Sequence, residues 1–114
     1  KPEAAFVHIH TEQAMADVTI DPGRAGITTA MIRLWHEDFS PYDAERVRLA
    51  LDAKVPGTPG LERDAVMAAD GTWVVDNLRI QSGGVWTARV IVERNGSTLV
   101  LDAPIVLAQC SNEC

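Results

Sequence analysis

Apolar and polar residues alternate along most of the chain, a pattern typical of strands that bury one face. Residues 6–11 and 15–20 are predicted to form the first two strands. The same alternation predicts further strands at residues 27–36, 45–53, 62–68, 73–80, 85–93 and 97–107. Helix signals are nearly absent, and residues 40–46 are expected to form a turn or a short helix at most.

Turn residues separate these segments about every 8–12 residues, the spacing of a β-sandwich. Asn95-Gly96 is the strongest hairpin signal, because both residues tolerate the positive φ that a tight turn requires. Seven to eight short strands therefore predict an all-β, immunoglobulin-like antiparallel β-sandwich. The chain has 114 residues, enough for one hydrophobic core. We expect one domain over residues 1–108 and a flexible tail over residues 109–114.

The alternation also predicts which side chains face the core. In the first two strands, these are Val7, Ile9, Ala16, Val18 and Ile20. In the third strand, Ala30, Ile32 and Leu34 share one face, and Met31, Arg33 and Trp35 share the other. Trp73 and Trp86 are expected to supply the aromatic part of the core. Trp35 falls on the opposite face of its strand from Ile32, next to His36.

Composition narrows the function classes. The formal net charge is -6, whereas nucleic-acid binding requires a basic face. No apolar run approaches the roughly 20 residues that span a bilayer, so we expect no direct membrane insertion of this chain. It contains no phosphate-binding glycine loop, metalloprotease helix or evident serine–histidine–carboxylate arrangement, and we expect no enzyme activity. Because Lys1 stands where a Met would begin a chain, targeting segments are expected to lie outside this sequence.

The segment from residue 6 to residue 17 contains the side chains that most strongly suggest a metal site. Residues two apart in a strand share a face, so His8 and His10 point the same way. If the chain reverses around residues 12–13, His10 lies opposite Met15 and His8 lies opposite Asp17. All four side chains would then project from one face, with the directly opposed pairs close together.

Two imidazoles and a thioether favour copper, because imidazole suits several transition metals and thioether sulfur prefers Cu(I). His8, His10 and Met15 are therefore the candidate copper ligands, with Asp17 and His36 as additional candidates. A metal on such an exposed strand could also bridge two chains into a dimer. The alternative is that the histidines are ordinary surface residues and that Met15 fills a gap in packing.

The stretch from His8 to Gly26 resembles the start of the soluble C-terminal domain of CopD/YcnJ-type bacterial copper transport and resistance proteins. Residues 70–73 and 84–90 are similar to the two aromatic strand openings of those domains and of the related YtkA/FixH-like sandwiches. The resemblance extends over nearly the whole chain, from about Ala5 to Ala108.

This resemblance implies a periplasmic or otherwise extracytoplasmic β-sandwich, attached to or beside a membrane copper importer. The family's His-x-His and following Met match His8, His10 and Met15. It implies a chaperone-like module of copper homeostasis that binds Cu(I) or Cu(II) and hands it to a membrane transporter or a cuproprotein. The rival interpretation is an interaction module that docks a membrane partner without metal.

The chain departs from that family at its end, where Cys110 and Cys114 form a Cys-x-x-x-Cys pair. Two thiolates there could hold Cu(I) as a second or transfer site. They could instead form a disulfide in an oxidising compartment, serve a thiol redox protein, or belong to an inert tail. The sequence leaves these alternatives open.

Overall fold

The computed structural model describes residues 3–110 of the chain, which contain nine strands and no helix. The strands are β1 (Ala5–His10), β2 (Met15–Asp21), β3 (Gly26–Trp35), β4 (Arg46–Ala53), β5 (Leu61–Asp64), β6 (Val66–Met67), β7 (Trp73–Ile80), β8 (Gly84–Arg94) and β9 (Ser97–Leu107). No helix that could cross a membrane occurs in this described part. The last four residues, and with them most of the predicted tail, lie outside it.

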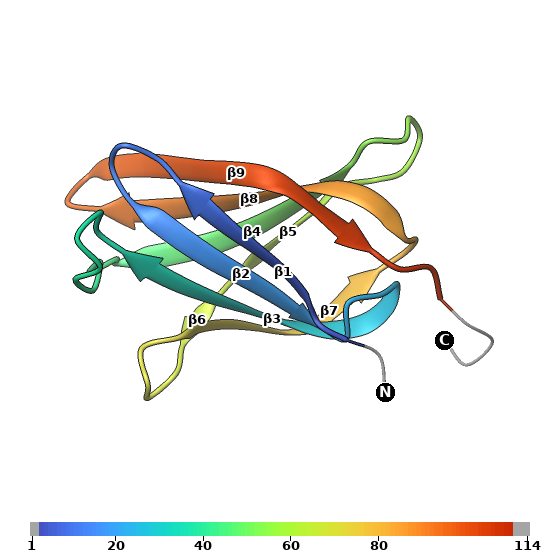
Figure 1. Cartoon of the computed structure of the whole chain (residues 1–114), viewed down its shortest axis with the longest axis horizontal. Coiled ribbons are helices and arrows are strands. Elements are labelled where there is room, and N and C mark those ends of the chain that lie inside the picture. The colour runs from blue at the N-terminus through green and yellow to red at the C-terminus, as the bar shows by residue number, and fades with distance from the viewer. Residues whose placement is uncertain (1–2, 111–114) are drawn as a thin grey trace.

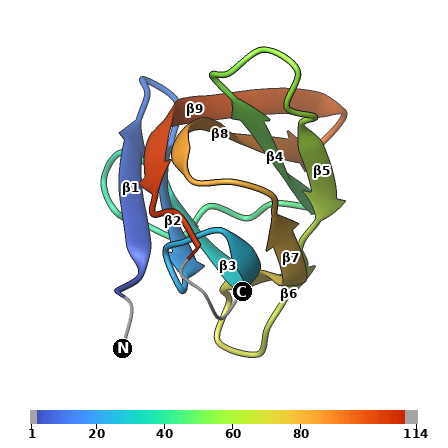
Figure 2. The ribbon, with the colours of Figure 1, turned by 90° about the vertical axis from the view of Figure 1, so that its right-hand side faces the viewer.

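The strands form two antiparallel sheets that pack face to face (Figure 1). One sheet has five strands in the order β1-β2-β3-β7-β6, and the other has four in the order β5-β4-β8-β9. Strands β1 and β9 lie side by side where the two sheets meet at one edge (Figure 2). The arrangement confirms the all-β sandwich that the alternation predicted.

The segment predicted as one strand over residues 62–68 is divided between the two sheets. Strand β5 pairs with β4 in the four-stranded sheet, whereas β6 pairs with β7 in the five-stranded sheet. The chain crosses at Ala65, which is buried and donates its backbone N–H to the carbonyl of Val47 at 2.9 Å. This crossing explains the nine strands in place of seven or eight. Residues 40–46 form no helix, and Pro41 makes an isolated bridge to Trp35 instead.

The core lies between the sheets and consists of the inward-facing side chains of both. Ile9, Ala16, Val18, Ile20, Ala30, Ile32 and Leu34 are all buried, and Val7 packs against them. Trp73 and Trp86 are buried as predicted, and the indole N–H of Trp86 donates to the Ser82 carbonyl at 3.0 Å. The core face predicted for β1 and β2 is thus confirmed, and the structure shows that Ala30, Ile32 and Leu34 form the inward face of β3.

Three turns gather at one end of the sandwich, the left end in Figure 1: those between β1 and β2, after β3, and between β8 and β9. The β8–β9 turn has φ of 51° at Asn95 and 76° at Gly96, both positive, as a type I′ hairpin requires. The candidate site lies at this end.

Candidate metal site

The turn between β1 and β2 reverses the chain around residues 12–13, as predicted. Thr11 closes it, because its backbone N–H and its hydroxyl both donate to the Ala14 carbonyl, at 2.9 and 3.0 Å. The Thr11 hydroxyl oxygen also accepts the backbone N–H groups of Gln13 and Ala14. This local network makes the hairpin tight and leaves its strands in one register.

That register confirms both predicted cross-strand pairs. His10 lies opposite Met15, and His8 lies opposite Asp17. Because the intervening Ile9 and Ala16 point into the core, the four side chains project from the opposite side of the sheet, which we call the outer face. The imidazole rings of His8 and His10 are exposed, with ring centroids 6.3 Å apart and planes inclined by 63°.

His8 is oriented by a carboxylate. Its Nδ1 lies 2.6 Å from Oδ1 of Asp17. The side chain of His8 is 43% exposed, and that of Asp17 is 23% exposed. An ionised carboxylate only accepts hydrogen bonds, so in the neutral imidazole that donates to it Nδ1 carries the hydrogen and Nε2 keeps its lone pair. In many metal sites, a carboxylate accepts a hydrogen bond from the ring nitrogen of a ligating histidine that does not bind the metal. Asp17 makes the same kind of contact with His8. This contact makes Asp17 a partner of a ligand and not an obvious ligand itself.

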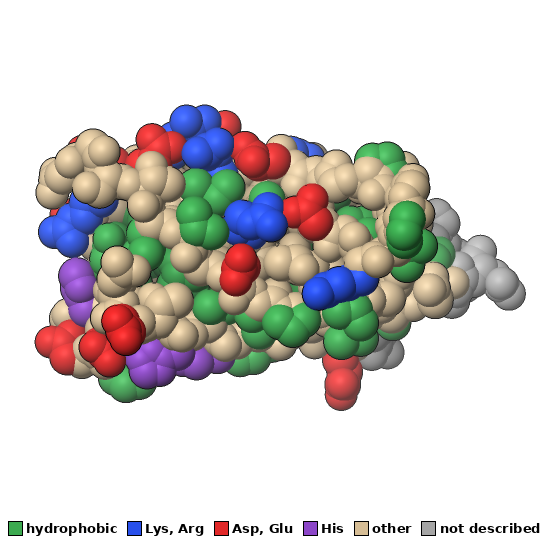
Figure 3. Space-filling model, turned by 90° about the horizontal axis from the view of Figure 1, so that it is seen from above, with side chains coloured by type: hydrophobic (Ala, Val, Ile, Leu, Met, Phe, Trp, Pro, Cys, Tyr) green, Lys and Arg blue, Asp and Glu red, His purple; other side chains and the backbone are tan. Residues whose placement is uncertain are grey.

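His10 has a different neighbour. Its Nε2 lies 3.6 Å from Oε1 of Glu37, in the loop after β3, and both side chains are more than half exposed. Together with Thr11 and Glu12 they line a shallow hollow of about 380 Å³. Sequence reasoning missed Glu37, because its proximity depends on the path of a loop from another strand. Histidine side chains and carboxylates lie together at this end of the surface (Figure 3).

Met15 is only 2% exposed although it faces outward. It is not a member of the main cluster of side chains between the sheets. Directly opposite it lie His10 on β1 and Trp35 on β3. Met15 is therefore a buried residue of the outer face, flanked in the register by a histidine and a tryptophan.

The other predicted donors lie away from this hairpin or outside the described residues. The ring of His36 faces Tyr42, with centroids 4.8 Å apart, and Arg94 lies over the same tyrosine ring at 5.3 Å. Cys110 is disulfide-bonded, and Cys114 lies outside the described residues.

Three or more His, Cys, Asp or Glu side chains placed to hold one metal do not occur within residues 3–110. The hairpin does place His8, His10 and Met15 on one face, and their two imidazoles and one thioether are candidate donors. Such a set suits a soft ion with few ligands, such as Cu(I).

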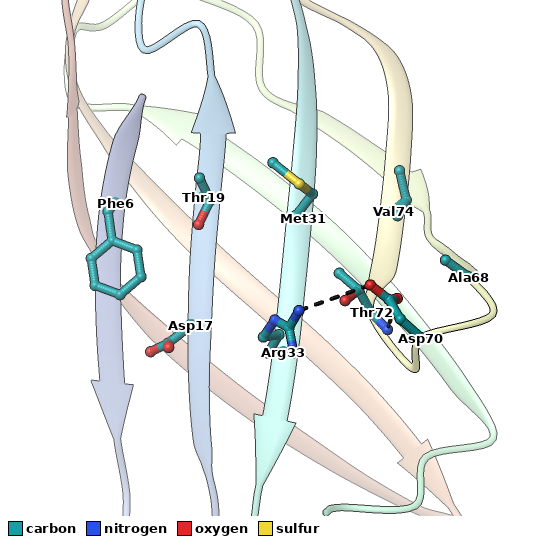
Figure 4. A pocket seen from close by; sticks show the side chains of 9 residues that line it. All are labelled: Phe6, Asp17, Thr19, Met31, Arg33, Ala68, Asp70, Thr72 and Val74. Atoms are coloured by element: carbon teal, nitrogen blue, oxygen red, sulfur yellow. Dashed lines mark hydrogen bonds and ion pairs between the residues drawn. The ribbon is translucent and has the colours of Figure 1, made fainter. Parts of the chain in front are cut away.

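A trough of about 310 Å³ lies on the outer face beside Asp17, the hydrogen-bond partner of His8 (Figure 4). It is bordered by Asp17, Arg33 and Asp70, with the last two 3.9 Å apart. The pKa of Asp70 lies below its usual value, because the carboxylate accepts the backbone N–H of Thr72 and lies beside its hydroxyl and Arg33. Asp70 therefore stays ionised in mildly acidic solution.

The chain was compared with protein-family models, curated proteins and solved structures, and no match was found in any of the three. The resemblance to CopD/YcnJ-type domains therefore stays a prediction from the sequence.

Proposed function

We propose that this chain is an extracytoplasmic copper-binding module that captures copper and passes it to a membrane transporter or a cuproprotein. The observation that carries the proposal is the hairpin register, which places His8, His10 and Met15 on one face. Two imidazoles and a thioether form a donor set that favours copper over the harder divalent metals.

The orientation of His8 supports the proposal. Its hydrogen bond to Asp17 leaves Nε2 as the free donor atom, and a carboxylate partner raises the basicity of a ligating imidazole. Both histidines are exposed, whereas Met15 is covered. An ion held there remains open to a partner's ligand on one side, as transfer between proteins requires.

The surface charge fits a cationic cargo. The net charge of -6 attracts cations at long range, an effect that salt weakens. Asp17 and Glu37 add carboxylates beside the two imidazoles. Copper is the cargo here and not a resident cofactor, so we propose no reaction catalysed by this chain.

Copper titration tests the proposal. The purified chain is titrated with Cu(I) and with Cu(II) against a chromophoric competitor, alongside the double variant His8→Ala/His10→Ala. We expect the double variant to bind copper more weakly by over about 100-fold, since even a partner of a ligand is typically worth 10–100-fold.

The matched control is His36→Ala, which removes an imidazole that faces Tyr42 and should leave copper affinity unchanged. The double variant Cys110→Ser/Cys114→Ser tests whether the terminal pair contributes. Wild-type protein that binds no copper, or a double histidine variant that binds it as tightly as wild type, would overturn the proposal.

The second candidate function is an interaction module without metal. It is favoured by an exposed apolar pair on the outer surface of the four-stranded sheet, where Val85 lies opposite Val106. These two side chains are 42% and 67% exposed. If docking is the function, Val106→Ser should impair it, and the double histidine variant should leave it intact.

A further inference from the structure

A row of three side chains crosses the outer face where β1, β2 and β3 run side by side. His10, Met15 and Trp35 occupy directly opposed positions on these strands. Side chains opposed in this way have Cβ atoms about 4.5–5.5 Å apart. The indole of Trp35 is thus the side chain next to the thioether on the side away from the histidines.

Met15 is the most buried side chain of this row. Only 2% of Met15 is exposed, whereas His10 is exposed and Trp35 is half-buried. Indole rings make favourable contacts with thioether sulfur, and their faces attract cations, tryptophan most strongly. A cation bound by Met15 therefore lies within reach of the Trp35 ring.

The loop after β3 holds Trp35 at this position. Pro41 bridges to the Trp35 backbone, and the ring of Phe39 packs at a tilt against the indole, with centroids 6.4 Å apart. Phe39 adopts a φ of 68° and is 67% exposed. A positive φ is unusual for an aromatic residue, and here it allows the loop to present the ring to Trp35.

We propose that the copper site takes the ion as Cu(I), and that the indole ring of Trp35 covers the bound ion beside Met15. The inference rests on the proposed function and deepens it, because it names the oxidation state and adds a residue to the site. The soft thioether favours Cu(I), whereas Cu(II) prefers nitrogen and oxygen ligands in a tetragonal plane. Asp17 is already engaged with Nδ1 of His8.

The experiment combines fluorescence with affinity on the whole chain. Oxygen-free Cu(I) is added to wild type, and we expect one equivalent to quench part of the tryptophan emission. The other two indoles, Trp73 and Trp86, are 8% and 1% exposed in the core and should be unaffected. In Trp35→Phe, which keeps an aromatic ring, the remaining emission should not respond to Cu(I).

Affinity is measured by competition with bicinchoninate. Trp35→Leu should weaken Cu(I) binding about tenfold, within the range for a cation on a tryptophan face, and Trp35→Phe should weaken it less. Cu(II) affinity should not change in either variant. The matched control is Phe6→Leu, which alters an exposed aromatic residue of β1 on the same outer face and should bind Cu(I) as wild type does.

The outcomes separate this inference from the proposed function. If wild type binds Cu(II) but no Cu(I), only this inference is overturned, and if it binds neither ion, the proposed function is overturned as well. If wild type binds Cu(I) without any change in tryptophan emission, or if Trp35→Leu binds it as tightly as wild type, only the role of Trp35 is overturned. The emission of wild-type protein decides the question even if Trp35→Leu fails to fold.

Discussion

Replacement of Asp17 by Asn tests whether this carboxylate strengthens copper binding by orienting His8, the proposed ligand, without binding the ion itself. The substitution keeps the size of the side chain and an oxygen that can accept from Nδ1 of His8. It removes the negative charge behind the 2.6 Å hydrogen bond. If Asp17 orients His8 and raises the basicity of Nε2, copper affinity should fall although no ligand is lost.

The magnitude follows from the contact and its exposure. Hydrogen bonds to a charged acceptor are about twice as strong as neutral ones, and loss of a partner of a metal ligand typically costs 10–100-fold in affinity. Because the side chains of His8 and Asp17 are 43% and 23% exposed, solvent screens the pair. We therefore expect the lower end, about tenfold or 1.4 kcal/mol, with a loss of folding stability of at most about 1 kcal/mol.

The assay is Cu(I) competition on Asp17→Asn and on the control Asp102→Asn. The control removes the same charge from an exposed position of β9, in the other sheet. Imidazole nitrogen chemical shifts should show Nδ1 of His8 protonated in wild type, with the neutral tautomers more evenly mixed in Asp17→Asn. Equal copper affinity in the two variants would refute the proposed role of Asp17.

Two further predictions concern the scaffold. Leu49→Ala, at a fully buried position, should lower the free energy of unfolding, measured in urea, by about 2–5 kcal/mol. The control Ile27→Ala, at a 56% exposed position, should lower it by less than about 0.5 kcal/mol. Equal losses in the two variants would contradict the assigned core. The hydroxyl and the backbone N–H of Ser40 donate to Asp38 and hold the pKa of its carboxyl below the usual value. The contact therefore stabilises the folded protein fully when the pH is above the pKa that Asp38 has in the unfolded chain. This stabilisation is lost as the pH falls through the lower pKa that Asp38 has in the folded protein. Ser40→Ala should raise the Asp38 midpoint in a carboxyl-carbon NMR titration, and an unmoved midpoint would contradict this.

The sequence alone was sufficient to predict the hairpin at the centre of the site. Alternation identified the inward residues, and a two-residue reversal allowed one register in which His10 meets Met15 and His8 meets Asp17. The structure has that register. The prediction succeeded because the contacts are local: neighbouring strands joined by a short turn have little freedom to slip when one face must be buried.

Long-range contacts decided the rest. The division of residues 62–68 between two sheets, the approach of Glu37 to His10 and the position of Trp35 beside Met15 depend on strands and loops remote from the residues concerned. Alternation reports which face of a strand is buried, and it does not report which strand lies beside it. The sequence therefore determined the candidate donor residues, their common face and the pairing of His8 with Asp17, whereas only the tertiary structure decided that Trp35 lies beside Met15 and Glu37 beside His10.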